Sequence, residues 1–180
     1  MRPNEYRIEG DTAFIKLERR DGSSLETMIS VSDLDRVINS GLRWSASWHK
    51  DTQSFRAHSI TKVNGRRTTI QLSRFILGTP AHLEADHINH NTLDNRRENL
   101  RSVTRSQNEQ NAHGARKDSS TGVRGVFWDK RRRNYRARIW LNGKGIHIGC
   151  FATLAEAEAA VRKAREKYFT HSPESKKGCA

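Results

Sequence analysis

The stretch of residues 84–111, EADHINHNTLDNRRENLRSVTRSQNEQN, constrains the fold more than any other part of the chain. A short run ending in an Asp-His pair is followed by residues 89–95, almost all of which favour turns. A second short run, residues 99–103, precedes a polar segment that a Thr or a Ser can cap as a helix. This order predicts a strand, a long loop, a second strand and a helix, with the reactive side chains at the joints.

The stretch resembles the ββα-metal motif of HNH endonucleases, a family that includes many phage and intron homing enzymes. In that family a His opens the motif, an Asn lies in its middle, and a His or Asn closes it on the helix. The matching residues here are His87, Asn99 and Asn108, separated by 12 and 9 positions. Asp86 directly precedes the first of them, as is typical of the family.

The sequence departs from the family at two positions outside that set. His90 stands where relatives often carry Gly in the turn, but His tolerates left-handed backbone better than most residues. Ser73 stands where relatives often carry His. We therefore expect the loop to keep its form.

The residue types fit phosphodiester hydrolysis, which needs an activated water, a neutralised phosphate and a stabilised leaving oxygen. A hard divalent cation supplies the last two. The resemblance implies that Asp86 and Asn108 bind one divalent ion, Mg²⁺ or alternatively Mn²⁺, which takes oxygen ligands and keeps several waters. His87 titrates near neutral pH and can accept a proton from water. Asn99 is implied to tie the loop backbone and to orient His87.

Two further expectations concern the same residues. Neighbours on a regular strand point to opposite faces, so the strand should end or distort at Asp86. A structural zinc site built from His82, His87 and His90 is an alternative. Such sites usually need four nitrogen or sulfur ligands at close spacing, whereas the cysteines lie far away in the sequence.

Charge points to the partner. The chain of 180 residues has a formal net charge of +13, and a balance this basic favours a polyanion, most often nucleic acid. Residues 114–169 hold 14 basic and 5 acidic side chains, whereas residues 1–113 hold 17 and 14. The C-terminal third therefore supplies most of the attraction.

The expected cellular compartment follows from the cysteines and from the absence of membrane-spanning and signal-peptide patterns. Cys150 and Cys179 form no disulfide framework and suit a reducing environment. No apolar run approaches the length of a membrane span, and the start lacks the apolar core of a signal peptide. We expect a cytoplasmic protein of a bacterial host cell, encoded by that host or by a phage, with no membrane partner.

The first part of the chain is expected to be rich in strands. Turn signals and alternation predict strands at residues 12–18, 24–29, 42–48, 55–61 and 66–72. Helical spacing predicts short helices at residues 31–38 and 72–78. Trp44, Trp48 and Phe55 are expected in the core.

The region after residues 113–121, whose small polar composition marks a linker, has its own pattern. Strands are predicted at residues 123–128, 135–141 and 146–151, with an Asn-Gly hairpin turn between the last two. Thr153 and Glu156 form a capping-box pair. An apolar stripe on the following helix is expected to pack on the sheet: Leu154, Ala157, Val161, Ala164 and Tyr168.

Residues 122–169 resemble the AP2 DNA-binding domain, known from plant transcription factors and from HNH homing enzymes. The likeness includes RGV at 124–126, YRARI at 135–139, IGCF at 148–151 and the closing AEAEAAVRKA. In that family a three-stranded sheet lies in the major groove of DNA.

Strand alternation supports a ligand-binding face independently of the resemblance. The apolar face of the second strand is claimed by the helix, which leaves the basic and aromatic face for a ligand. Arginines there can read guanine edges or hold phosphates; the alternative is a solvated basic face. The residues expected to contact nucleic acid are Arg124, Trp128, Arg133, Arg136, Arg138, Trp140, Lys144 and His147.

Together these features predict an α+β chain in which an HNH ββα-metal unit follows a β-rich N-terminal region and precedes a three-stranded antiparallel sheet packed on one helix. The expected division is residues 1–112 with the motif at 84–111, a linker at 113–121, an AP2-like domain at 122–169 and a flexible tail at 170–180. The resemblances imply a monomeric, metal-dependent endonuclease of homing or mobile-element type that cuts double-stranded DNA. The alternatives are a non-catalytic AP2-type DNA-binding regulator and, third, an RNA-binding protein, although the aromatic pattern of an RRM is missing.

Overall fold

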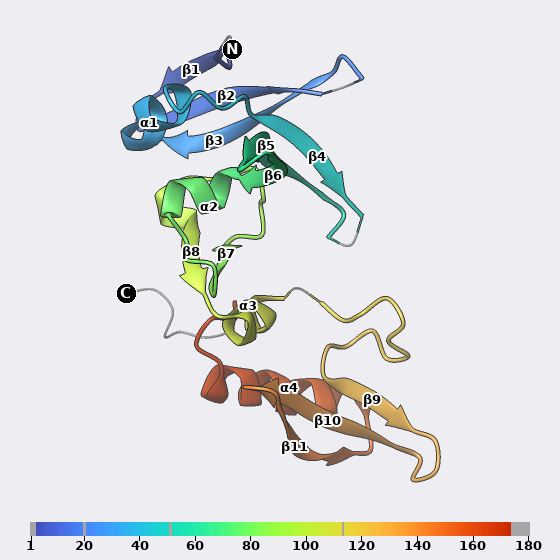
Figure 1. Cartoon of the computed structure of the whole chain (residues 1–180). Helices are drawn as coiled ribbons and strands as arrows, with labels where there is room; N and C mark the ends of the chain where they lie inside the picture. Colours follow the sequence, from blue (N-terminus) through green and yellow to red (C-terminus); the bar gives the residue numbers. More distant parts are fainter. Residues whose placement is uncertain (1–2, 20, 51, 113, 174–180) are drawn as a thin grey trace. The chain divides into compact units, whose positions relative to one another are not determined.

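The computed structural model describes residues 3–19, 21–50, 52–112 and 114–173. These residues form two compact units, divided between Val103 and Thr104. Each unit has its own hydrophobic core, and strands predominate over helices in the part of the chain described (Figure 1). The α+β class predicted from the sequence is consistent with this mixture.

The first unit is built on a six-stranded sheet in the order β1-β2-β4-β5-β6, with β3 paired to β2. Neighbouring strands are antiparallel except for β2 and β4, which meet at the single parallel pair Glu18 and Ser45. β5 and β6 form the predicted hairpin, and both turn residues, Asn64 and Gly65, have positive φ. The strands are β1 (Tyr6–Glu9), β2 (Thr12–Glu18), β3 (Ser24–Ser30), β4 (Ser45–His49), β5 (Ser54–Val63) and β6 (Arg66–Gln71).

Strand alternation builds the core of this unit. Ala13, Ile15 and Leu17 on β2 are fully buried, whereas the residues between them are partly exposed. Among the aromatic residues, Trp44 is buried as predicted and its ring lies 5.4 Å from that of Phe75. The prediction of a core position was wrong for Trp48, which is 53% exposed. It lies next to the turn between β4 and β5, where its ring packs 4.9 Å from that of its strand partner Phe55 and not in the core.

Short helical segments link the strands of this unit, and α2 (Leu72–Leu77) alone lies between the six-stranded sheet and a second, two-stranded one. The segments are the 3-10 turns η1 (Val31–Asp33) and η2 (Arg97–Asn99), and the helices α1 (Leu34–Ile38) and α2. α2 ends at Gly78, whose left-handed φ of 64° closes the helix as predicted. β7 (Glu84–His87) then pairs antiparallel with β8 (Leu100–Val103). The strand pair frames the loop that carries the candidate site.

The second unit contains α3 (Arg105–Asn111), β9 (Val126–Asp129), β10 (Asn134–Leu141), β11 (Lys144–Phe151) and α4 (Leu154–Tyr168). The three strands form an antiparallel sheet in the order β11-β10-β9, and α4 packs on it (Figure 1). Ala157, Val161 and Ala164 of α4 are buried as predicted. Tyr168 is 39% exposed, and the following Phe169 fills the core instead, because α4 ends at Tyr168 and the chain turns inward.

The first strand of this sheet begins three residues later than predicted. Gly125 has a φ of +84°, and a Cβ there would lie 2.6 Å from the carbonyl oxygen of Arg138. The amide of Arg138 also donates to the carbonyl of Gly125 at 2.8 Å. A side chain at this position would therefore clash with β10, and residues 123–125 form a tight turn rather than a strand.

The division into units differs from the predicted boundary near residue 113. α3 belongs to the second unit, whose internal contacts hold it. Of the predicted linker, residues 114–121 are described and contain no helix or strand; residue 113 lies outside the described residues, as do residues 174–180 of the predicted tail.

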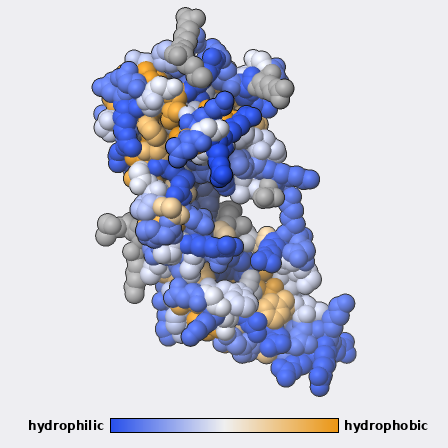
Figure 2. All heavy atoms as spheres, in the orientation of Figure 1, coloured by the Kyte–Doolittle hydropathy of each residue, from blue (hydrophilic) through white to orange (hydrophobic). Residues whose placement is uncertain are grey.

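The surface of the protein is mainly hydrophilic. Hydrophilic residues cover most of the face in Figure 2, with apolar residues in small separate patches. No helix within the described ranges has both the length and the apolar character needed to cross a membrane.

Candidate active site and nucleic-acid interface

Asp86 and Arg101 form a cross-strand ion pair on β7 and β8. The register places the two residues directly opposite each other. Oδ2 of Asp86 accepts from Nε of Arg101 at 2.9 Å and lies 2.8 Å from Nη2. The Asp86 side chain is only 7% exposed, so the guanidinium compensates a buried negative charge. Arg101 was not predicted from the sequence as a residue of the site.

His87 is the last residue of β7, and its ring turns toward the loop. Nε2 of His87 lies 3.1 Å from Oδ1 of Asn95. The expected strand distortion at Asp86 does not occur, since both residues pair with β8; the strand ends one residue later. Burial lowers the pKa of His87 below its ordinary value, although the Asn95 hydrogen bond and the Asp86 charge oppose this effect. The ring is therefore biased toward its neutral form.

The orientation of the Asn95 amide follows from the hydrogen bonds on the side away from His87. The hydroxyl of Thr27 donates to the carbonyl of Leu93 at 2.8 Å, so its oxygen is left to accept. Nδ2 of Asn95 donates to that oxygen at 2.9 Å, which turns Oδ1 toward His87. An amide oxygen can only accept, so Nε2 of His87 carries the proton and Nδ1 carries the lone pair in the neutral ring.

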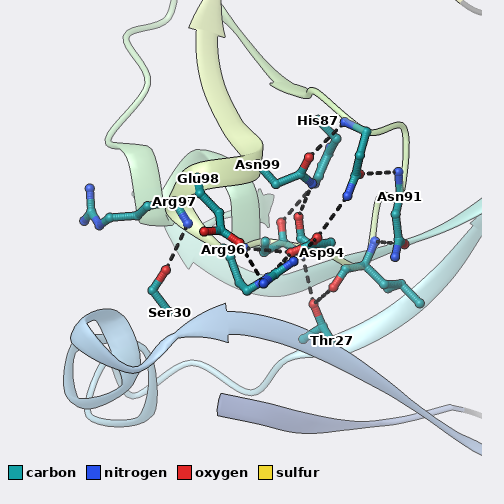
Figure 3. Close-up of polar contacts among 12 residues, drawn as sticks. Thr27, Ser30, His87, Asn91, Asp94, Arg96, Arg97, Glu98 and Asn99 are labelled. Carbon is teal, nitrogen blue, oxygen red and sulfur yellow. Dashed lines mark hydrogen bonds and ion pairs between the residues drawn. The ribbon is translucent and has the colours of Figure 1, made fainter. Parts of the chain in front are cut away.

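Asn99 closes the loop between the two strands (Figure 3). Its Oδ1 accepts from the amide of Asn89 at 2.9 Å, and its Nδ2 donates to the carbonyl of Asp94 at 2.7 Å. Its main-chain carbonyl accepts from Ile88 at 2.9 Å. His90 adopts a φ of 65°, so the turn forms with His in place of Gly. One buried amide thus joins both ends of the loop that follows His87.

Two ion pairs hold the outer part of this loop. Asp94, which is almost completely buried, accepts from Arg96, and this hydrogen bond holds the pKa of its carboxyl below the ordinary range. Arg97 donates from Nε and Nη2 to the two oxygens of buried Asp33 at 2.8 and 2.7 Å. Arg97 is also bound to Ser30 through its amide (Figure 3). The loop is therefore fixed to β3 and η1, which are far away in the sequence.

Asn108 lies on α3, in the second unit. Thr104 caps this helix: its hydroxyl accepts from the amide of Gln107, and the Gln107 side chain accepts from the amide of Thr104. Of the two predicted caps, Thr104 and Ser106, Thr104 caps the helix, and its capping box starts the helix directly after β8. The amide of Asn108 donates to the carbonyl of Thr104 at 2.9 Å. Its role as a metal ligand stays a prediction.

The donor set suits a cation that takes few protein ligands. Within the described ranges no group of three or more His, Cys, Asp and Glu side chains could hold a metal ion, and His82, His87 and His90 do not form one. Asp86 supplies a single buried carboxylate. Mg²⁺ commonly binds through one or two carboxylates while keeping waters and substrate phosphate oxygens, and this donor set fits such an ion better than zinc.

The three-stranded sheet of the second unit has a basic face. On β10, Ala137 and Ile139 are buried against α4, whereas Trp140 is 61% exposed. Arg138 pairs with His147 of β11, so the two side chains share one face. Phe127 of β9 pairs with Arg136 on that same face, and the guanidinium groups of Arg136 and Arg138 each lie 5.9 Å from its ring centre. We call this the basic face: Phe127, Arg136, Arg138, Trp140 and His147.

Other predicted nucleic-acid residues lie elsewhere in the unit. Trp128 pairs with Tyr135, and their rings are 4.7 Å apart, which places Trp128 on the opposite face of the sheet. Arg133 is exposed in the β9–β10 turn with a φ of 52°, and Lys144 is exposed at the hairpin end of β11. The guanidinium of Arg124 donates to main-chain carbonyls at the end of α3. Phe127 is the face residue that sequence reasoning missed, although its alternation with Trp128 could have indicated it.

Comparison with known proteins concerns only the middle of the chain. Residues 77–110 match the family model described as HNH endonuclease, which supports an HNH nuclease and, with it, a DNA substrate. No curated protein and no solved structure matches the chain.

Proposed function

We propose that this chain is a metal-dependent endonuclease that hydrolyses phosphodiester bonds in double-stranded DNA. The observation that carries the proposal is the buried Asp86 beside His87, whose ring is held by Asn95, in the segment that matches the HNH endonucleases. A structural turn alone needs no buried Asp-Arg pair beside an oriented imidazole.

His87 acts as the general base. The neutral ring carries its lone pair on Nδ1, because Nε2 donates to Asn95. Nδ1 takes a proton from the attacking water, and the negative charge of Asp86 favours the resulting imidazolium. Asn99 acts on the backbone: by joining Asn89 to Asp94 it holds the loop that begins at His87.

Asp86 and Asn108 would hold the divalent ion, Mg²⁺ or Mn²⁺. When bound, such an ion neutralises charge on the phosphate and stabilises the leaving oxygen. Arg101 supports this arrangement by holding Oδ2 of the Asp86 carboxylate in place.

The second unit is an AP2-like module that binds duplex DNA through its basic face. Its partly exposed arginines beside Trp140 and Phe127 suit both phosphate contacts and base edges in a major groove. We also propose that the enzyme acts as a monomer in the cytoplasm of a bacterial host, as a homing or mobile-element nuclease of that host or of a phage. The basic face alone would equally suit a DNA-binding regulator without cleavage, which makes cleavage the deciding measurement.

The test is incubation of supercoiled plasmid with the protein in Mg²⁺, with and without a chelator, beside the His87→Ala variant. We expect nicked or linear product only for the wild-type protein with metal. Binding without any product, under conditions where Mg²⁺ and Mn²⁺ are both tried, would favour the regulator.

A further inference from the structure

The segment that matches the HNH endonucleases is divided between the two compact units. Residues 77–110 include β7 and β8, which belong to the first unit, and nearly all of α3, which belongs to the second. Only Thr104 separates β8 from α3 in the chain. α3 has only seven residues and needs contacts outside the helix to hold it. A helix this short is not stable on its own in water.

Arg124 binds the carboxyl end of α3. Its Nη1 donates to the carbonyl of Gln110 at 3.1 Å and to that of Ala112, and its Nη2 donates to the carbonyl of Glu109. The last carbonyls of a helix have no partner within the helix, and a cation there is favoured by the helix dipole. One guanidinium thus satisfies three acceptors at the end of α3.

Arg124 is itself anchored to the rest of the second unit. Its main-chain carbonyl accepts from Nη2 of Arg165 on α4 at 3.0 Å, and its guanidinium lies 5.9 Å from the ring centre of Phe169. It also precedes Gly125, whose backbone bonds β10. The cap on α3 is therefore continuous with the core of the sheet and α4.

Side chains of α3 make two further attachments to the same unit. Gln110 is only 4% exposed, and its Oε1 accepts from the amides of Thr170 and His171 at 2.9 and 3.3 Å. Ser106 donates to Oδ1 of Asn142, in the β10–β11 turn, at 3.1 Å, and accepts from its amide at 3.2 Å. Both ends of α3 are thus tied to the unit that carries the basic face.

We propose that Arg124 is a positioning residue for cleavage: through its hold on α3, the DNA-binding unit places the helix that carries Asn108. This inference rests on the proposed function, in which Asn108 contributes to the nuclease. It assigns the Arg124 guanidinium to helix capping rather than to DNA, and it makes the C-terminal unit part of the nuclease and not a detachable module.

Charge-conserving variants of the full chain separate the two roles of Arg124. Arg124→Lys keeps the positive charge but cannot span three carbonyls from one nitrogen, and Arg124→Ala removes both. Arg162, exposed on α4, offers matched controls in Arg162→Lys and Arg162→Ala. Hydrogen exchange of the α3 amides, DNA affinity, and the KM and kcat of cleavage are measured for each.

We expect the α3 amides to exchange roughly tenfold faster or more in both Arg124 variants, as suits the loss of charged hydrogen bonds, and unchanged exchange in the Arg162 controls. The cleavage rate at saturating DNA should fall by roughly tenfold or more in Arg124→Lys. The KM and the DNA affinity of this variant should equal those of Arg162→Lys. Unchanged α3 exchange would overturn the proposal, as would faster exchange with normal cleavage.

A second variant guards against simple misfolding. Gln110→Met removes the acceptor for Thr170 and His171, whereas Gln110→Glu keeps one, so Gln110→Glu should restore α3 protection that Gln110→Met loses. Equal protection of the α3 amides in the two variants would contradict the proposal that the second unit holds α3. A wild-type protein that cuts no DNA with any divalent ion would instead overturn the proposed function, and the exchange data would still decide whether α3 is held in this way.

Discussion

Nε2–H of His87 donates a hydrogen bond to Oδ1 of Asn95 at 3.1 Å. Thr27 orients the Asn95 amide for this contact by accepting from its Nδ2. The contact joins the last residue of β7 to a loop residue that is 1% exposed. It determines which nitrogen of the imidazole can act as a base.

The first prediction concerns Thr27. Thr27→Val removes the oxygen that accepts from Nδ2 of Asn95, so the amide loses its preferred orientation. We expect cleavage to fall by roughly tenfold, the equivalent of one unsatisfied buried group. Thr27→Ser keeps the hydroxyl and should stay near wild type. Nitrogen NMR of His87 should report an Nε2-protonated ring in the wild-type protein and in Thr27→Ser; an Nδ1-protonated ring would contradict the proposed base.

The second prediction concerns the base itself. His87→Ala should lower the single-turnover cleavage rate by about 10²–10⁴-fold, the usual contribution of general acid-base catalysis. DNA affinity should change little, because the second unit supplies most of the net positive charge. If the variant cuts at the wild-type rate, His87 is not the base.

The third prediction is the pH dependence of cleavage. Burial lowers the pKa of His87 below its ordinary value of 6.5, so more than half of the rings are in the neutral, active form at that pH. The rate should therefore fall to half of its maximum only below pH 6.5, as the ring becomes protonated. Single-turnover rates across this range, with metal at saturation, test it. A rate that falls to half of its maximum above pH 6.5 would contradict the lowered pKa of His87.

The fourth prediction concerns the metal. Asp86→Ala removes the only carboxylate of the proposed ligand set and should abolish cutting, while gel-shift affinity stays nearly intact. Glu84→Ala, on the same strand, is the matched control for the loss of one acidic side chain. Cutting by Asp86→Ala at the wild-type rate in Mg²⁺ would mean that the metal assignment is wrong.

The fifth prediction concerns the basic face. If Arg138 neutralises one phosphate, Arg138→Ala should make the slope of log affinity against log salt shallower by about 0.9. If it reads a base instead, the slope should hold and one position of the target should lose selectivity. Arg162→Ala, on the helix that covers the other side of the sheet, should do neither. If Arg138→Ala keeps the wild-type affinity, salt slope and selectivity, the basic face is a solvated surface that does not contact DNA.

Much of the local structure was predictable because its causes are local. The Asn64-Gly65 hairpin, the helix end at Gly78 and the capping boxes at Thr104 and Thr153 depend on residues within a few positions of one another. Alternation likewise predicted which side of β10 faces α4. Predictions of burial failed at Trp48 and Tyr168, which lie near the ends of a strand and a helix and are exposed. Hydropathy alone does not indicate which residues near the end of an element still pack on the core.

The sequence by itself determined the candidate catalytic residues, the order of the elements after β1 and the basic C-terminal region, since these depend on residue type and spacing. Only the tertiary structure decided their partners. Asn95 meets Thr27 across 68 positions, Arg101 meets Asp86 through strand register, and Arg124 caps α3 instead of facing outward. Such contacts arise from long-range packing, where a buried polar group must find a partner wherever the fold brings one, and no local pattern specifies which residue that will be.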